Sequence, residues 1–483
     1  MSDILAHQRF VQVRPNSNIV GPAFNTSIQI STTIPSGNTW VPNESFISIQ
    51  CLVQARATVG GVGNLSNALA AGGAAAGGSI CLSSNPIACL FDRCTMRIND
   101  ITVSTLDNVP ITSTALMLCG SSKPTVSTSE SDCPIWLWDR DVLPTTLADG
   151  TAVTGNVLTP TATAAYLNDM MIVPTSYIAA RSKTRNKNLL NSPCSRLQYT
   201  RFNWKPNFGL FDSDHRVQAN SRISFEFNVS NQYAVQFFNG VIFDGTTIPP
   251  SSIISTSPPA VGQITLAIQD MSMYMSIHET YENPTKHISM RVSEAWTSYK
   301  SLSASNDTLS YMIPPSTYKL LVCFVDSQYQ NNTATSPSDF GPVNHSNLAI
   351  PFASILQSIS VGIAGEVNPM YPYNWPNGLY STTPATDTGD AYRAYREAMY
   401  SMEAYSDMSG SIYDEVTWSY NPIFVMRIFK QSSDVGKNLD VRVQCLATPV
   451  SINCVVIALY HREIGLAYDQ HSVLSNVMIS DLI

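Results

Sequence analysis

The sequence predicts an all-β protein built from two antiparallel β-sandwiches in tandem. Apolar and polar residues alternate with a period of two in several short segments, which is typical of half-buried strands. Charged residues make up only 13% of the 483 residues, about half the usual share, and 29 prolines contribute to the difference. A proline-rich segment at 244–262 divides the chain into two parts of similar size, and each part is long enough to bury its own core.

The clearest strand is the segment 222–229, in which every second residue is apolar, and 24–34 and 440–445 repeat this pattern. Residues 98–101 read Ile-Asn-Asp-Ile, which predicts a two-residue hairpin turn between two strands. The alternating residues of the first segment are Ile223, Phe225, Phe227 and Val229.

Two segments, 318–325 and 452–460, are apolar throughout, which predicts strands that are buried on both faces. Met271, Met273 and Met275 lie two residues apart, so they are predicted to share one face of a strand.

One segment is predicted to be helical, at 390–405. Tyr392, Tyr395, Met399 and Met402 form a stripe at helical spacing that is expected to pack on the core. Asp387, Thr388 and Asp390 are candidate N-caps, and a Ser-Gly pair at 409–410 is predicted to end the segment.

These observations predict four parts of the chain. They are an N-terminal arm at 1–23, a first sandwich at 24–243, a linker at 244–262 and a second sandwich at 263–483. Two long loops are expected in the first sandwich, at 57–84 and 121–163, and loops of this length usually serve contacts or function.

Composition excludes several classes of protein. The net charge of −8 argues against direct binding of nucleic acid, which needs clustered Lys and Arg. No apolar stretch is long enough to span a membrane, and the N-terminus does not resemble a signal peptide. The ten cysteines are therefore expected to be reduced and mostly buried, and no cofactor is expected.

Signatures of enzymes are largely missing from the sequence. The seven histidines are scattered, and no Cys-x-x-Cys pair predicts a zinc site. Asp212 and Asp214 are candidate carboxylates for catalysis or cation binding, although a turn rich in Asp explains them more simply. Trp136 and Trp138 are interpreted as anchors of a subunit contact, with stacking on a sugar ring as the alternative. We therefore expect a structural protein that is not an enzyme.

Several segments resemble double jelly-roll major capsid proteins of the polinton, virophage and adintovirus kind. The resemblance is strongest near the C-terminus. The matching segments, in chain order, are Phe91–Asp100, Pro206–Phe211 with Arg222–Val229, the tyrosine-rich Tyr392–Glu397, Tyr420–Val425, Leu439–Leu446, and Ile452–Tyr460 followed by His461-Arg462-Glu463. Asp100 stands where this family is expected to carry Gly in the hairpin.

The resemblance implies two eight-stranded jelly rolls in tandem, three copies of which form a pseudo-hexagonal trimer that tiles an icosahedral shell around a DNA genome. It implies a virion protein made and assembled inside the host cell without secretion. Its partners are neighbouring capsomers, penton proteins and minor capsid proteins. Loops at 331–347 and 370–388 are then assigned to the second jelly roll, together with the long loops of the first.

The N-terminal segment 1–20 is expected to reach beneath a neighbouring capsomer, because apolar residues interrupt an otherwise arm-like sequence. The candidate contact residues in this segment are Ile4, Leu5, Phe10 and Val11. Three alternatives remain open at this point: a carbohydrate-binding or carbohydrate-active sandwich, a single-jelly-roll coat protein with a protruding domain, and a fibre or adhesin, against which the lack of a visible repeat argues.

Overall fold

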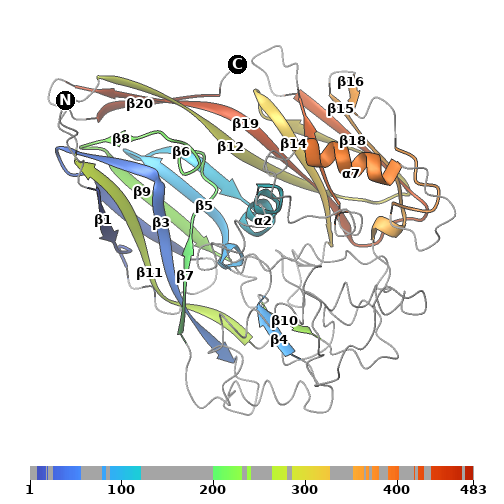
Figure 1. Cartoon of the computed structure of the whole chain (residues 1–483), viewed down its shortest axis with the longest axis horizontal. Coiled ribbons are helices and arrows are strands. Elements are labelled where there is room, and N and C mark those ends of the chain that lie inside the picture. The colour runs from blue at the N-terminus through green and yellow to red at the C-terminus, as the bar shows by residue number, and fades with distance from the viewer. Residues whose placement is uncertain are drawn as a thin grey trace.

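The described residues of the chain form two β-sandwiches that lie side by side (Figure 1). The structure is a computed structural model. It describes residues 8–17, 19, 26–55, 79–82, 87–120, 199–230, 237–240, 264–279, 286–326, 352–363, 366–368, 373–379, 390–401, 418, 422–428, 437–469 and 474–481.

The first sandwich contains eight principal strands in two antiparallel sheets. One sheet has the order β1-β11-β3-β7, with the short β8 on β3, and the other has the order β2-β9-β5-β6. Numbered along the chain, the first sheet takes the first, eighth, third and sixth principal strands, which is the arrangement of a jelly roll. The bounds are β1 Gln8–Val13, β2 Ser27–Thr33, β3 Asn38–Ala55, β5 Phe91–Ile98, β6 Ile101–Asp107, β7 Tyr199–Trp204, β8 Val217–Gln218, β9 Arg222–Val229 and β11 Ile264–Glu279.

The second sandwich repeats this strand order. Its sheets are β12-β19-β14-β17, with β20 paired to β19, and β13-β18-β15-β16. The predicted pair of eight-stranded jelly rolls is therefore confirmed. The bounds are β12 His287–Ser301, β13 Asn306–Ile313, β14 Thr317–Asp326, β15 Leu356–Ile363, β16 Glu366–Asn368, β17 Ile423–Arg427, β18 Lys437–Cys445, β19 Ile452–Tyr468 and β20 Leu474–Asp481. A separate pair joins β4 (Ser79–Leu82) to β10 (Phe237–Gly240).

The pairing of β11 changes two predicted boundaries. Strand β1 lies within the predicted N-terminal arm at 1–23, yet it pairs with β11 and is the first strand of the first jelly roll. The sequence predicts a second jelly roll at 263–483, but β11 pairs antiparallel with both β3 and β1. Residues 264–279 are therefore the eighth strand of the first jelly roll. The predicted linker at 244–262 lies outside the described residues, between two strands of one jelly roll. Prolines interrupt strand pairing in the same way within a domain as between domains, so composition alone could not distinguish the two cases.

The predicted strands are confirmed where the structure describes them. Along β9, the four residues Ile223, Phe225, Phe227 and Val229 are buried and the residues between them are more exposed. The three methionines of β11 are almost fully buried on one face. Strand β14 and residues 452–460 of β19 are buried on both faces, as the apolar sequences of 318–325 and 452–460 predict.

The predicted hairpin between β5 and β6 forms at Asn99 and Asp100, which both have positive φ angles, of 46° and 65°. These angles fit a type I′ turn, which matches the twist of a two-stranded hairpin. The Asn99 carboxamide oxygen accepts a hydrogen bond from the backbone N–H of Arg222 at 2.8 Å, so the turn is also tied to β9.

We expect Asp100→Gly to raise the free energy of unfolding by about 0.5 kcal/mol, because Gly adopts a positive φ without steric cost. The ion pair that Asp100 makes with Arg222 spans 3.3 Å between two exposed side chains, so its loss costs little. Urea denaturation of both proteins measures the difference, and a clear loss of stability would show that the ion pair outweighs the turn.

Two α-helices are described, where the sequence predicted one. Helix α7 (Asp390–Ser401) confirms the predicted segment, and its remaining residues 402–405 lie outside the described part. Its buried residues are Ala394, Ala398 and Met399, whereas Tyr392, which was expected on the core, is 51% exposed. Met399 and Tyr395 of the predicted stripe do pack on the core, so the buried face of the helix overlaps the stripe but is rotated from it.

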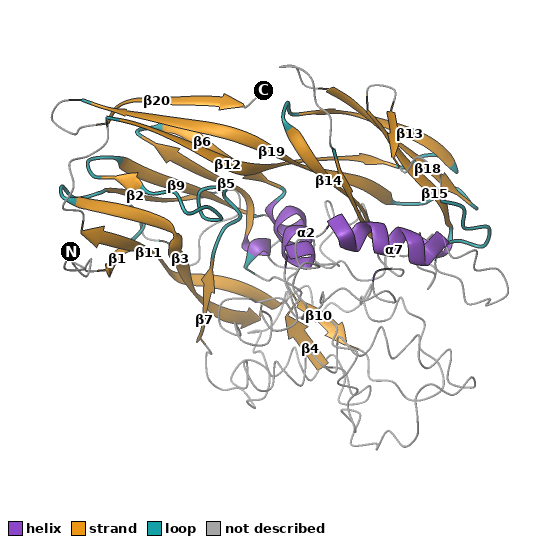
Figure 2. Cartoon of the chain, turned by 45° about the horizontal axis from the view of Figure 1, so that its top comes forward, coloured by secondary structure: helices purple, strands orange, loops and turns teal. Residues whose placement is uncertain are grey.

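Helix α2 (Val109–Gly120) was not predicted from the sequence. Residues 109–115 are all buried, so the first two turns of the helix have no face exposed to solvent. These turns carry apolar and small polar residues on every side, and the sequence therefore shows no apolar stripe with a period of 3.6. In Figure 2 helix α2 lies between the main bodies of the two sandwiches, whereas α7 runs along the second sandwich, with one end near α2.

Aromatic side chains fill both cores. In the first sandwich Trp40, Phe211 and Phe225 meet edge to face, with ring centroids 6.0–6.2 Å apart. In the second, Phe424 contacts both Trp418 and Phe324. Such pairs add to the free energy gained from burial, so each sandwich has a well-packed core of its own.

Candidate functional site: the joint and the outer surfaces

The two jelly rolls are joined by strands of the second that extend over the first. Strand β19 pairs with β14 only along the first half of β19, residues 452–460. The second half of β19 pairs with β20 and with the first half of β12. These three strands reach across the first sandwich (Figure 1), and we call their contact with it the joint.

Glu294 lies at the centre of the joint, on β12, and is 2% exposed. Both of its carboxylate oxygens accept hydrogen bonds from the first jelly roll. The Ser104 hydroxyl on β6 donates to Oε2 at 2.6 Å, and the Gly209 backbone N–H donates to Oε1 at 3.2 Å. A buried carboxylate with two donors from the other sandwich fixes how the two sandwiches sit against each other.

Burial raises the pKa of Glu294 to about 7. The Ser104 and Gly209 hydrogen bonds and the charge of Arg462 lower this pKa, while the charge of Asp212 raises it. Desolvation is the largest of these effects, because a carboxylate loses strong hydration when it is buried. The joint therefore holds an acid that titrates near neutral pH.

Gly209 allows the two sandwiches to approach closely at this point. A Cβ atom at this position would lie 2.5 Å from the Ser293 carbonyl oxygen and 2.8 Å from Glu294 Oε1. Both distances are far below van der Waals contact, so no other residue fits there without moving β12. Gly209 lies in the Pro-Asn-Phe-Gly-Leu-Phe segment, where Phe208 and Phe211 are fully buried in the first core.

Further polar contacts surround Glu294. Each joins one residue of the first jelly roll to one of the second, so they tie the sandwiches together along the whole joint. They are Arg462 Nη1 to the Val103 carbonyl oxygen (3.3 Å), Thr112 to Thr297 (2.6 Å), Ser221 to Tyr468 (3.1 Å), His215 to the Arg291 carbonyl oxygen (2.9 Å) and Asn99 to the Leu474 carbonyl oxygen (3.2 Å).

Helix α2 completes the joint at its other end. Leu116 and Cys119 line a small cavity together with Leu321 of β14 and Leu459 of β19. The helix therefore lies on the outward face of the β12-β19-β14-β17 sheet of the second jelly roll, while it also contacts β5 and β6 of the first. This apolar contact adds hydrophobic stabilisation to the polar joint.

The outward face of the β1-β11-β3-β7 sheet carries an aromatic cluster. The cluster consists of Phe10, Phe46 and Tyr274, which come from three adjacent strands. The ring centroids of Phe10 and Phe46 are 5.9 Å apart, and those of Phe46 and Tyr274 are 5.2 Å apart. Phe10 is 51% exposed. Beside the cluster, Glu44 accepts hydrogen bonds from Ser276 (2.5 Å) and from His278 (2.8 Å), and these contacts lower the pKa of Glu44.

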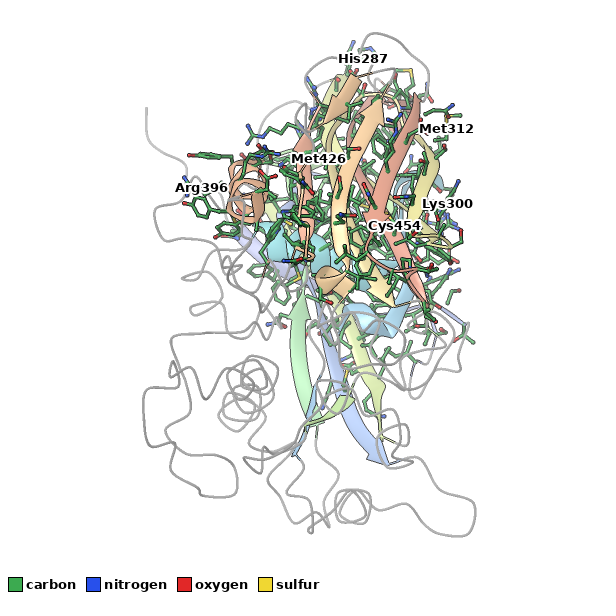
Figure 3. The ribbon with its side chains drawn as sticks, turned by 90° about the vertical axis from the view of Figure 1, so that its right-hand side faces the viewer. His287, Lys300, Met312, Arg396, Met426 and Cys454 are labelled. Atoms are coloured by element: carbon green, nitrogen blue, oxygen red, sulfur yellow. The ribbon has the colours of Figure 1, made fainter. Side chains whose placement is uncertain are left out.

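A second group of exposed aromatic residues lies on α7. The guanidinium of Arg396 lies over the rings of Tyr392 and Tyr400, at 5.9 Å and 4.9 Å from their centroids. Nη2 of Arg396 also donates to the Tyr400 hydroxyl at 2.9 Å. Figure 3 places Arg396 on the opposite side of the second sandwich from Lys300 and Met312. Tyr and Arg are enriched at the centres of protein interfaces.

The structure tests only some of the predicted contact residues. Trp136, Trp138, Ile4 and Leu5 lie outside the described residues. Phe10 and Val11 lie on β1, which pairs with β11 of its own chain, and this holds residues 8–13 against the first sandwich. Whether Phe10 and Val11 contact a second subunit stays a prediction.

The alternative chemistry gains no support from the described residues. Asn43 donates a hydrogen bond to Asp214 at 2.9 Å. Asp212 lies close enough to the joint for its charge to raise the pKa of Glu294. Asp212 and Asp214 therefore each interact with residues of the fold itself. In the part of the chain that the structure describes, no three His, Cys, Asp or Glu side chains are grouped to hold a metal ion. No helix there is long and apolar enough to cross a membrane.

The cysteines with described side chains are buried and free, as the sequence predicted; burial raises the pKa of Cys445 and Cys454 to about 12. At neutral pH these thiols are therefore protonated and poorly reactive.

Comparison with solved structures identifies the arrangement of the two sandwiches. A chain in the cryo-EM structure of the Sputnik virophage aligns over 100% of this chain and 90% of its own length, with a TM-score of 0.58 and 12% identity. The chain has the double jelly-roll fold. The mavirus major capsid protein aligns less closely, with a TM-score of 0.47, 9% identity and coverage of 98% of this chain and 90% of its own. The Faustovirus major capsid protein aligns with a TM-score of 0.46, 11% identity and coverage of 96% and 91%. No family model and no curated protein sequence matches.

Sequence reasoning missed the centre of the joint. One signal could have identified Glu294: it occupies a position on the same face of β12 as Met290 and Val292, which are both buried. A lone acidic residue in an apolar series requires a partner. The identity of its partners, Ser104 and Gly209, could come only from the tertiary structure.

Proposed function

We propose that this chain is a viral major capsid protein, of the kind found in virophages and related double-stranded DNA viruses. The observation that supports it best is the alignment of the whole chain with a chain of the Sputnik virophage particle, over both jelly rolls. The resemblance of the C-terminal segments to double jelly-roll capsid proteins supports the same function independently of the structure.

In this proposal three copies form a capsomer that contains six similar jelly rolls, and such capsomers tile an icosahedral shell. The joint around Glu294 gives each chain a fixed pair of jelly rolls, which is what a repeating lattice needs. Neighbouring capsomers, penton proteins and minor capsid proteins are the expected partners in the virion. The near-neutral composition, with a net charge of −8 over 483 residues, lets such units pack closely without strong repulsion.

The proposal predicts a stable homotrimer. Size-exclusion chromatography with light scattering is expected to give the mass of three chains of 52.7 kDa each, and negative-stain images of the same fraction should show compact six-cornered particles. A monomer that persists at high protein concentration would contradict the capsid function, and binding of a saccharide by that monomer would favour the carbohydrate alternative.

A further inference from the structure

The two α-helices occupy the same place in their respective jelly rolls. Helix α2 follows β6 and precedes β7, which are the fifth and sixth principal strands of the first sandwich. Helix α7 lies between β16 and β17, which are the fifth and sixth principal strands of the second. Because the two helices hold equivalent positions, the surface that α2 contacts indicates which kind of surface α7 can contact.

Within the chain, α2 lies on the outward face of the next jelly roll. Its Leu116 and Cys119 meet Leu321 and Leu459 of the β12-β19-β14-β17 sheet, and its Thr112 hydroxyl bonds to Thr297 of β12. This sheet contains the first, eighth, third and sixth strands of the second jelly roll. The contact is thus between the helix of one jelly roll and a defined sheet of the following one.

The corresponding outer side of α7 is exposed in the single chain. Ala394, Ala398 and Met399 face its own sandwich, and α7 contacts β17 there. Tyr392 and Tyr400 point away and are 51% and 56% exposed, with Arg396 between them. In the described part of the chain no following jelly roll exists for this side to contact.

The corresponding sheet of the first jelly roll is β1-β11-β3-β7, and its outward face is also open. It carries the Phe10, Phe46 and Tyr274 cluster, with Phe10 51% exposed, and the carboxylates of Glu44 and Asp270 lie on the same face. An aromatic and acidic face is complementary to a helix that presents Tyr and Arg, because cations attract both carboxylates and aromatic rings.

The residues on the two sheet faces indicate that the contact of α2 within the chain is permanent, whereas a contact on the first sheet forms only during assembly. The face that α2 covers is mainly apolar, with Leu321, Val425 and Leu459, although Lys319 lines the same cavity. The face of the first jelly roll instead combines the partly exposed rings of Phe46 and Tyr274 and the exposed Phe10 with the exposed Gln12, so a free chain can expose it before assembly.

We propose that α7 of one copy docks on the outward face of the β1-β11-β3-β7 sheet of a second copy, in the way that α2 docks on the β12-β19-β14-β17 sheet within the chain. The inference rests on the proposed capsid function and deepens it. The contact joins two different surfaces, so repeated copies follow one another head to tail and close into a ring when the rotation permits.

The test uses full-length chains with one of the two surfaces changed. The helix variant carries Arg396→Glu and Tyr400→Ala, and the sheet variant carries Phe10→Lys. Removal of such interface residues typically weakens association by about 30-fold or more, so we expect either variant to be monomeric at concentrations where the unaltered chain is a trimer. Met312→Lys is the matched control, because Met312 is 62% exposed on the opposite side of the second sandwich (Figure 3).

Mixing the two variants provides the decisive result. Each mixed pair retains one intact helix and one intact sheet, so an equimolar mixture is expected to form dimers and no closed trimer in light scattering. Trimers in both single variants would overturn the docking inference while leaving the capsid function in place. Monomers in the mixture would also overturn it, as would loss of the trimer in Met312→Lys. If the unaltered chain itself stays monomeric, the proposed function fails first. Circular dichroism of each variant checks that it is folded.

Discussion

The variant Gly209→Ala is expected to lower the free energy of unfolding by about 3 kcal/mol. The added Cβ would lie 2.5 Å from the Ser293 carbonyl oxygen, 2.8 Å from Glu294 Oε1 and 2.9 Å from the Val292 Cβ atom. The nearest of these atoms belongs to the backbone of β12, which cannot move by a simple change of rotamer. Overpacking of this kind costs ~1–3 kcal/mol, and displacing the Gly209 N–H from the buried carboxylate adds a comparable loss.

Urea denaturation followed by tryptophan fluorescence measures this effect. Gly120→Ala is the control, because no atom lies within 4 Å of a Cβ at the last residue of α2, and we expect it to change stability by less than about 0.5 kcal/mol. Equal stability of Gly209→Ala and the unaltered protein would show that the two sandwiches do not meet as closely as the joint requires. A separate early transition in the variant would show that the jelly rolls come apart before they unfold.

The variant Glu294→Gln is expected to remove a pH dependence of stability. The pKa of Glu294 is about 7 in the fold, against an ordinary pKa of 4.5 for a glutamate side chain in water. Between these two values the unfolded chain has already lost a proton that the folded chain retains, so raising the pH destabilises the fold across this window. Below pH 4.5 both states are protonated and the group contributes no pH dependence, and above pH 7 the destabilisation is complete. Its size is on the order of 3 kcal/mol.

Other titrating groups act differently, so the comparison must be made between the two proteins at each pH. Burial lowers the pKa of His461, which destabilises the fold as the pH falls below about 6.5. The lowered pKa of Glu44 gives stability that is lost only in more acidic solution. Both groups are unchanged in the variant, and their contributions therefore cancel in the difference.

Unfolding midpoints in urea at pH 5 and pH 8 provide the measurement. At pH 5 the two proteins are expected to be nearly equal, because a protonated Glu294 and a Gln are both neutral. At pH 8 the variant is expected to be more stable by up to about 3 kcal/mol, since its amide oxygen can accept one of the two donated hydrogen bonds without a buried charge. Parallel pH profiles for the two proteins would mean that Glu294 is ionised at little cost, and that its neighbours compensate for burial.

The sequence predicted most of the strands because strand periodicity is a local property. In β9 the alternation alone identified the four residues that face the core, and in β14 and residues 452–460 of β19 the uniform apolar sequence predicted burial on both faces. The Asn-Asp pair at 99–100 likewise predicted its hairpin, because the required positive φ angles are a property of the turn itself.

The same reasoning did not predict features that depend on partners far away in the chain. Helix α2 has no amphipathic stripe, because the first jelly roll and the second together bury it almost all round. Strand β11 follows a run of prolines that resembles a domain linker, yet it completes the first jelly roll by pairing with β3. Neither result can be deduced from a window of neighbouring residues.

By itself the sequence determined that this protein is made of two antiparallel sandwiches with apolar strands and little charge, because composition and periodicity set which faces avoid water. Only the tertiary structure decided which strand belongs to which jelly roll, and that Ser104, Gly209 and Glu294 meet, although 85 to 190 residues separate the bonded partners in the chain. The physical reason is that burial is encoded residue by residue, whereas pairing is selected by the whole set of competing contacts in the folded chain.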